Sequence, residues 1–298
     1  MSGPVSVSLL TEDDIPGAID SIQEAFADDP YHHWIFDDQS KFSPERNRIS
    51  LDLRCRWGMR NALFHVAKDA DTQQVLGVAM WLRPQAHNEP PSWQEWSEGW
   101  LLWLQQIGMN LRYGHGGLNV RRYYIWKSAQ QALHDELWKD PRGYYFCNIV
   151  TVRPEAQGRG VGKSLMKKVL DQADKEGVMC YLESSRAEPN IAIYERMGFY
   201  AVREMECDDK GVKVKVRVTA PILRYTYNSP SLRSLYVQYV NNQQPSRPRM
   251  RLDDLMLTSL PTFPQYLRVS WDILTTQLFC MMRDSKPVQG DNGSAGTS

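Results

Sequence analysis

Three glycines stand at alternate positions in a short turn between an expected strand and an expected helix. The strand covers about residues 144–152 and the helix begins at about Val161; the glycines are Gly158, Gly160 and Gly162. Such a turn exposes the unpaired N–H groups of the first helical turn at the positive end of the helix dipole, where an anion can bind. Cationic residues flank it: Arg159, Lys163, Lys167 and Lys168. The pattern favours a phosphate-binding turn over the alternative, a tight turn that uses glycine only for its geometry.

Two common phosphate-binding loops do not fit this turn. A Walker A loop that ended in Gly162-Lys163-Ser164 would need its first glycine at position 157, which is Gln157. A dinucleotide-binding G-x-G-x-x-G that began at Gly158 would need glycine at position 163, which is Lys163. Neither a P-loop nucleotidase nor a Rossmann dehydrogenase is therefore indicated.

The pattern that fits is Q-x-x-G-x-G, at Gln157, Gly160 and Gly162. It resembles the pyrophosphate-binding signature of the GNAT superfamily of acyl-CoA N-acyltransferases. A second stretch resembles that family's Asn-x-x-x-Tyr-Glu-Arg-x-Gly-Phe motif, matched at Asn190, Tyr194, Glu195, Arg196, Gly198 and Phe199. Residues 182–185, Leu-Glu-Ser-Ser, are similar to a small-molecule branch that includes puromycin N-acetyltransferase and fungal relatives. The resemblance covers roughly residues 5–226 and is specific between 144 and 206.

The resemblance implies acetyl-CoA as co-substrate and no metal. The turn would hold the pyrophosphate through Gln157, Gly158, Arg159, Gly160, Val161, Gly162 and Lys163. The end of the preceding strand would offer main-chain groups to the pantetheine arm at Val150, Thr151 and Val152, and Asn190 would lie near the same arm.

The resemblance also places Tyr194 at the thioester sulfur as general acid, against the alternative of a half-buried helix tyrosine. We take Glu183 as the first candidate for the general base, because burial can raise the pKa of a carboxyl at a strand end. A structural glutamate bonded to backbone N–H groups is the alternative. Weaker candidates for the base are His134 and His33. Covalent catalysis by Cys180 or Cys147 ranks below all of these candidates, because no histidine is visibly placed to activate either thiol.

We expect an α/β GNAT fold with a mixed, mostly antiparallel central sheet, splayed at the cofactor strand and flanked by helices. Apolar periodicity predicts the remaining elements. They are strands at about 5–10, 63–67, 75–81, 178–183, 200–206 and 212–218, and helices at about 15–26, 44–59 and 191–197. Thr11 and Asp14 predict a capping box at the start of the first helix.

Three further segments bear on the acceptor and on domain organisation, and the second of them, a helical insertion, is the main departure from a minimal domain. The aromatic run 31–36 either shapes an acceptor pocket or forms a packed loop with two surface histidines. A helical insertion at about 84–140 carries Trp93, Trp96, Trp100 and Trp103 at helical spacing. We expect these tryptophans to pack in the core, and the alternative is an aromatic wall for a bulky acceptor. We assign residues 1–227 to the acetyltransferase domain, and 228–298 to a linker plus a partly disordered C-terminal extension whose residues 252–282 could form helices that pack on the domain.

Composition limits the partners. Lys+Arg and Asp+Glu are both 35 in 298 residues, so no general nucleic-acid surface is indicated. The five cysteines are scattered, which favours buried reduced thiols: Cys55, Cys147, Cys180, Cys207 and Cys280. We find no signal peptide in residues 1–10 and no membrane-spanning stretch, and therefore expect a cytoplasmic protein.

These features predict direct transfer of acetyl from acetyl-CoA to a primary amine of a small molecule, in detoxification or secondary metabolism. The alternatives are a protein or peptide N-acetyltransferase and a non-catalytic acyl-CoA-binding module. The chain is expected to act as a monomer or homodimer.

Overall fold

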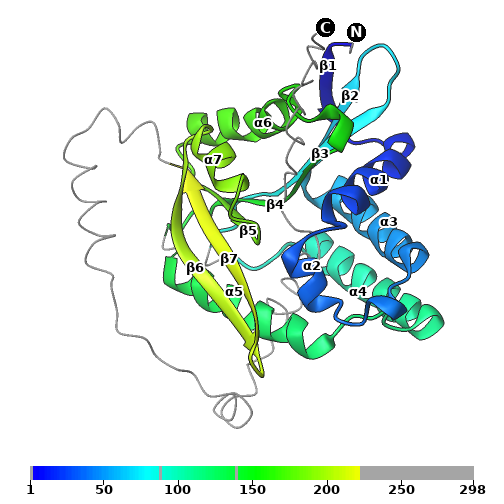
Figure 1. The fold of residues 1–298 in the computed structure, drawn as a ribbon. Helices are drawn as coiled ribbons and strands as arrows, with labels where there is room; N and C mark the ends of the chain where they lie inside the picture. Colours follow the sequence, from blue (N-terminus) through cyan, green and yellow to red (C-terminus); the bar gives the residue numbers. More distant parts are fainter. Residues whose placement is uncertain (1–2, 87–88, 138–139, 222–298) are drawn as a thin grey trace, which may run out of the picture.

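One seven-stranded sheet forms the centre of the domain in the computed structural model, which describes residues 3–86, 89–137 and 140–221 (Figure 1). The strand order is β1-β2-β3-β4-β5-β7-β6, and only β4 and β5 pair in parallel within that sheet. The strands are β1 (Val5–Leu9), β2 (Leu63–Asp69), β3 (Val75–Leu82), β4 (Tyr145–Val152), β5 (Cys180–Ser184), β6 (Phe199–Asp209) and β7 (Val212–Pro221). The expected mixed, mostly antiparallel sheet is confirmed.

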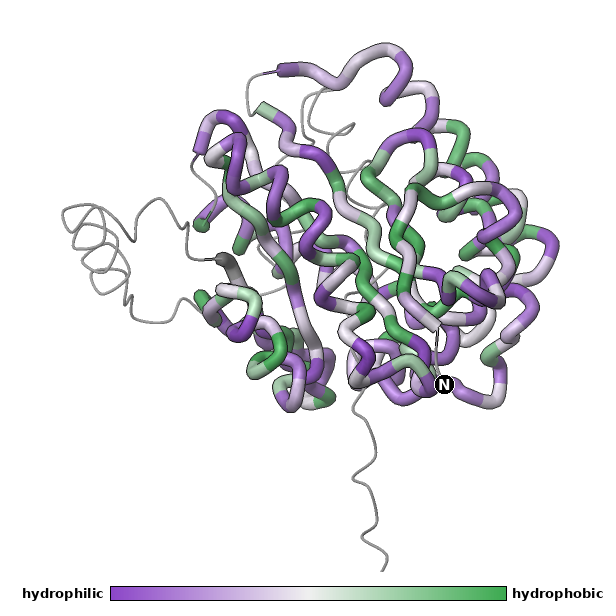
Figure 2. Tube along the Cα trace, turned by 90° about the horizontal axis from the view of Figure 1, so that it is seen from above, coloured by the Kyte–Doolittle hydropathy of each residue, from purple (hydrophilic) through white to green (hydrophobic). Residues whose placement is uncertain are grey.

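Helices cover both faces of this sheet (Figure 1). Two of them, α6 (Val161–Glu176) and α7 (Asn190–Glu195), share one core with the sheet. The other core joins the opposite face to α1 (Ile15–Phe26), α2 (Pro30–Ile35), α3 (Pro44–Asn61) and α5 (Val120–Leu137). α4 (Trp93–Tyr113) lies outside this layer, against α3. Short 3-10 turns complete the chain: η1 (Glu12–Asp14), η2 (Gln39–Lys41) and η3 (Pro154–Ala156). Figure 2 shows hydrophobic residues gathered along the strands and the inward sides of helices.

The sheet opens between β4 and β5. Their parallel pairing ends at Cys147 and Leu182, although β4 continues to Val152. At the same place the register of β3 on β4 shifts, so that Asn148 is the extra residue of a β-bulge. A bulge bends and twists its strand, and this one turns the second half of β4 away from β5. The expected splay at the cofactor strand is therefore present.

One alternative that the sequence left open is excluded, and one sequence prediction is wrong. The aromatic run 31–36 is not a loop, because Pro30 and the N-cap Asp29 start α2 there, and the Asp29 carboxylate accepts a hydrogen bond from the His32 N–H at 2.9 Å. The tryptophans of α4 do not all pack in the core, since Trp93 is 82% exposed and Trp100 is 37% exposed. Periodicity identified the helix but could not tell which side of it the domain covers.

The four cysteines among the described residues are buried thiols, as the sequence predicts: Cys55, Cys147, Cys180 and Cys207. Burial raises the pKa of the Cys55 and Cys207 thiols to about 12. Cys280 lies outside the described residues, as do the expected linker and the whole C-terminal extension, residues 228–298. Among the helices that the structure describes, none is long and apolar enough to cross a membrane.

Candidate active site

The glycine turn is an open backbone cradle at the start of α6. Gly160 is the N-cap residue in the left-handed conformation, and Gly158 also has a φ of +77°. A Cβ at either position would have no heavy atom within 4 Å, so the backbone conformation, and not crowding, favours glycine there. The turn therefore leaves open space where side chains would otherwise stand at the start of α6, and helix starts of this kind can bind anions.

The charged residues of the turn have different environments. The Arg159 guanidinium donates hydrogen bonds to Gly3 O at 2.8 Å and to Asp69 Oδ2 at 3.0 Å, and these bonds tie the turn to β2. This interaction lowers the pKa of the Asp69 carboxyl. Lys163 is exposed on the first turn of α6, and Val161 and Gly162 are buried beneath it. Lys163 is consequently the cation of the turn best placed to meet a phosphate.

Residues 150–152 lie beyond the part of β4 that pairs with β5, and their side chains pack within the domain. Val150 and Val152 are buried in the core under α6, and the Thr151 hydroxyl lies 2.8 Å from the Ser21 hydroxyl of α1. On β3, a Cβ at Gly77 would lie 2.3 Å from Thr151 O, so only glycine allows the two backbones to approach this closely.

Two predicted cofactor residues carry buried oxygens with no hydrogen-bond partner among the described residues: Gln157 Oε1 and Asn190 Oδ1. Asn190 is anchored through its other amide atom, which donates to Ser184 Oγ at 3.0 Å. Buried acceptors normally have a partner. These two atoms, with the open glycine cradle, fit a ligand that carries an anionic group and amide donors, as acetyl-CoA does.

Tyr194 lies on α7 and is fully buried in the core beneath α6, with its ring centroid 6.0 Å from that of Phe199. Glu183 lies on β5 and belongs to the opposite side of the sheet, toward α5. The structure thus puts the two predicted catalytic side chains on opposite faces of the sheet beside its opening.

Glu183 is the centre of a buried polar cluster and is 3% exposed. Its carboxylate accepts hydrogen bonds from the Tyr181 hydroxyl and, at 2.8 Å, from Gln130 Nε2. Burial raises the pKa of Tyr181 well above its usual value, so this hydroxyl stays protonated as a donor. The partners are side chains, not the backbone N–H groups that a purely structural glutamate was expected to use.

His134 of α5 adjoins the same carboxylate. Its Nε2 is 3.4 Å from Glu183 Oε1, and its Nδ1 is 2.9 Å from the Tyr144 hydroxyl. Of the two histidines considered as bases, the structure brings His134 to Glu183 and leaves His33 exposed on α2. Burial raises the pKa of the Cys180 thiol, which disfavours the thiolate that a nucleophile needs.

The aromatic residues of α2 approach this cluster. Tyr31 is buried with its ring 5.1 Å from that of Trp126 on α5, and burial, with Glu183 among its neighbours, raises the pKa of Tyr31. The Trp34 indole donates to Val212 O at 3.1 Å. Tyr31 of α2 and Gln130 of α5 therefore lie near Glu183, whereas Trp34 contacts the tip of the β6–β7 hairpin, away from the Glu183–Val218 pair.

Sequence reasoning named His134 as a candidate base but did not predict its closeness to Glu183, and it missed Gln130, because both residues lie in the insertion, outside both motifs. Gln130 and His134 are four residues apart and thus share a helix face, and Tyr181 and Glu183 share a strand face. Those two spacings were the only sequence signals that could have indicated a polar cluster around Glu183. Also missed was Asp29, a buried carboxylate that accepts from Ser185 Oγ at 2.5 Å and joins α2 to the end of β5.

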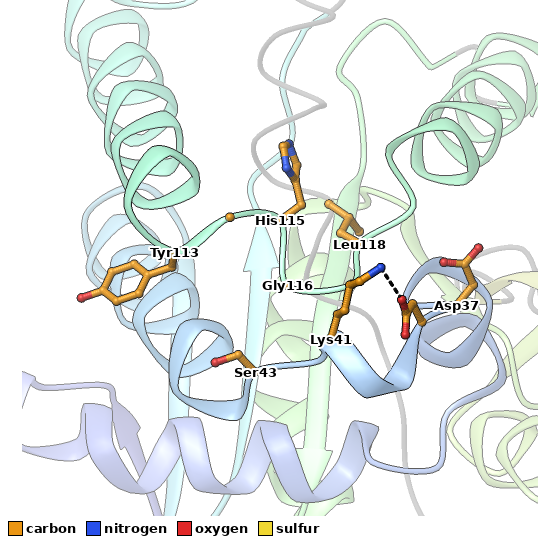
Figure 3. A pocket seen from close by; sticks show the side chains of 10 residues that line it. Asp37, Lys41, Ser43, Tyr113, His115, Gly116 and Leu118 are labelled. Carbon is orange, nitrogen blue, oxygen red and sulfur yellow. Dashed lines mark ion pairs between the residues drawn. The ribbon is translucent and has the colours of Figure 1, made fainter.

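A separate hollow of about 510 Å³ lies between the loop after α2 and the glycine-rich connection of α4 to α5. Figure 3 shows Tyr113, His115 and Leu118 among the residues that line it, and the Lys41–Asp38 ion pair, at 2.7 Å, belongs to the same lining. None of the predicted site residues lines this hollow. Within the described part of the chain, no group of three potential metal ligands occurs.

The chain belongs to the acetyltransferase (GNAT) family, whose family model matches residues 20–199. A curated relative is an uncharacterized N-acetyltransferase of Schizosaccharomyces pombe, 35% identical over 63 residues. That match covers 21% of this chain and only about a quarter, 26%, of the relative.

Similar solved structures have low identity to the chain. A histone acetyltransferase HPA2-related protein of Corynebacterium glutamicum is 20% identical, with 74% of this chain and 98% of that chain covered and a TM-score of 0.45. Arylalkylamine N-acetyltransferase 2 of Aedes aegypti is 14% identical, with 74% and 100% covered and a TM-score of 0.46. The ribosomal-protein-S18-alanine N-acetyltransferase of Escherichia coli is 14% identical, with 73% and 93% covered and a TM-score of 0.38. These names include both a small-molecule and a protein acceptor.

Proposed function

We propose that this GNAT acetyltransferase transfers acetyl from acetyl-CoA directly to a primary amine of a small molecule. The observation that carries the proposal is the position of Glu183, a buried carboxylate beside the opening of the sheet and covered by α5. A primary amine must lose a proton before it can attack a thioester, and a carboxylate held in such a cluster can accept it.

Acetyl-CoA, when bound, supplies the thioester acyl group. The chain's own residues hold and orient it: the N–H groups at the start of α6 and Lys163 would bind the diphosphate, and the backbone of residues 150–152 and Asn190 would bind the pantetheine arm. Orientation of this kind contributes a large part of the catalytic effect when two reactants must meet.

Proton transfers complete the proposed mechanism. Glu183 takes the proton of the ammonium group, and His134, 3.4 Å away, adjoins Tyr144 and so gives that proton a route toward the surface. The Tyr194 hydroxyl would supply a proton to the departing thiolate from the other side of the opening, and the second proton that the nitrogen loses on becoming an amide would restore that hydroxyl.

The cover over Glu183 favours a small acceptor. Gln130, Tyr181 and His134 surround the carboxylate, and Tyr31 approaches it from α2. An extended peptide would require an open groove at this place, whereas a small amine needs only a narrow entrance. The resemblance to the small-molecule branch, carried by residues 182–185, agrees with this choice but rests on sequence alone.

We expect thiol release from acetyl-CoA with at least one member of a panel of small primary amines, and none above background with lysine-containing or free N-terminal peptides. The matched control is the N-acetylated form of each accepted amine, which has no nucleophilic nitrogen. Turnover with peptides alone would contradict the small-molecule assignment, and binding of acetyl-CoA without turnover of any amine would favour the non-catalytic module.

A further inference from the structure

Helix α4 is apolar on two opposite faces. One face carries Gly99, Leu102 and Met109, which are buried, and Leu102 packs with Trp57 of α3. The other face points away from the domain and carries exposed large side chains, which we call the α4 stripe: Trp93, Trp100, Leu104 and Leu111. Leu111 is 83% exposed and Leu104 is 57% exposed.

The α4 stripe has the spacing of a helix–helix contact. Positions 93, 100, 104 and 111 are separated by steps of seven and four residues, so at 3.6 residues per turn they fall in one narrow row about 27 Å long. Rows of this kind on a soluble domain mark an interaction surface, because single exposed apolar residues are common but contiguous ones are not.

The chain itself contains a matching row beyond the last described strand. Between residues 265 and 282, five of the apolar residues recur in steps of four, three, four and three: Leu267, Trp271, Leu274, Leu278 and Met281. This is the a/d pattern of a helix that packs on another helix, and it would extend about 21 Å, close to the length of the α4 stripe. Helices of this length are marginal in isolation and need a partner for their apolar face.

The connection is long enough for the two rows to meet. β7 ends at Pro221, so residues 222–266 join it to the C-terminal row. A flexible segment of that length has a root-mean-square span of about 35–40 Å, comparable with the size of the domain. A tethered segment is present at a local concentration in the millimolar range, which favours it over a second copy of the chain.

We propose that residues 267–281 form an amphipathic helix that packs on the α4 stripe of the same chain. The proposal is independent of the acetyl-transfer assignment, because it concerns the outer face of the insertion and no residue of the candidate active site.

Amide hydrogen exchange of the full-length protein tests this proposal. Peptides that cover residues 267–281 should be protected in the wild type, and in Leu104→Glu they should exchange at least about tenfold faster. The reason is that a charge in the middle of the stripe would have to be buried under the packed helix. Since Leu104 is largely exposed, peptides from β3, β4 and α6 should keep their wild-type protection in the variant, which shows that the domain itself is still folded.

Gln105→Glu is the matched control: it adds the same charge one residue away, at an exposed position outside the stripe, and should leave the protection unchanged. Three results would overturn the proposal. They are rapid exchange of residues 267–281 in the wild type, protection that survives Leu104→Glu, and protection that falls on dilution together with a dimeric mass in light scattering, which would identify a second copy as the occupant.

Discussion

Glu183→Gln is expected to lower kcat/KM for the accepted amine by about 10²–10⁴-fold, the usual contribution of a general base. Glutamine preserves the shape and can still accept from Tyr181, but it cannot take a proton at neutral pH. The measurement is steady-state thiol release over a range of amine concentrations. Because the carboxylate lies away from the glycine turn, the affinity for acetyl-CoA should stay within about twofold, well under the 1.4 kcal/mol of a tenfold change.

Glu89→Gln controls for the loss of one negative charge, since Glu89 is exposed in the loop before α4. It should retain wild-type turnover. If Glu183→Gln also retained it, Glu183 would be a structural residue and His134 would become the leading candidate for the base, to be tested by His134→Gln.

Tyr194→Phe is expected to reduce kcat by about 10²-fold or more, because the thiolate would leave without a positioned proton donor. Removing a hydroxyl keeps the ring and its contact with Phe199, so the affinity for acetyl-CoA should change little. Single-turnover acetyl transfer at saturating amine separates this chemical step from product release.

Tyr145→Phe provides the matched control for this change. Its hydroxyl donates to Glu176 Oε2 at 2.6 Å on the α6 side of the sheet, so the variant should lose about 1 kcal/mol of stability and keep its turnover. Equal losses of kcat in Tyr194→Phe and Tyr145→Phe would show that the effect is structural and not catalytic.

The parts of the site that follow from local chemistry were predictable from the sequence. The step from β4 through the glycine turn to α6 is encoded by glycine conformation, helix capping and apolar periodicity within one short stretch. The same holds for Asn190 and Tyr194, which one motif places on one short helix. Both the fold class and the splay of the sheet were expected on this basis.

The parts that depend on tertiary contacts were not predictable. The bulge at Asn148 has no marker in the sequence, although it bends β4 at the opening. The partners of Glu183 come from α5, a helix whose position on the sheet no motif specifies. The tryptophans of α4 show the same limit, since a helix with two apolar faces gives one periodic signal and does not say which face the domain covers.

A thermal-unfolding titration with acetyl-CoA tests the central claim most directly, in the wild type, Gly160→Ala and Gly160→Glu. The wild type should gain about 2.7 kcal/mol at a ligand concentration of 100 times the dissociation constant. Gly160→Ala measures the cost of a side chain at a φ of +77° and should retain most of the gain, whereas Gly160→Glu places a negative charge at the proposed phosphate site and should lose it. Equal stabilisation of all three proteins, or none in the wild type, would contradict the assignment of the glycine turn as the acetyl-CoA site.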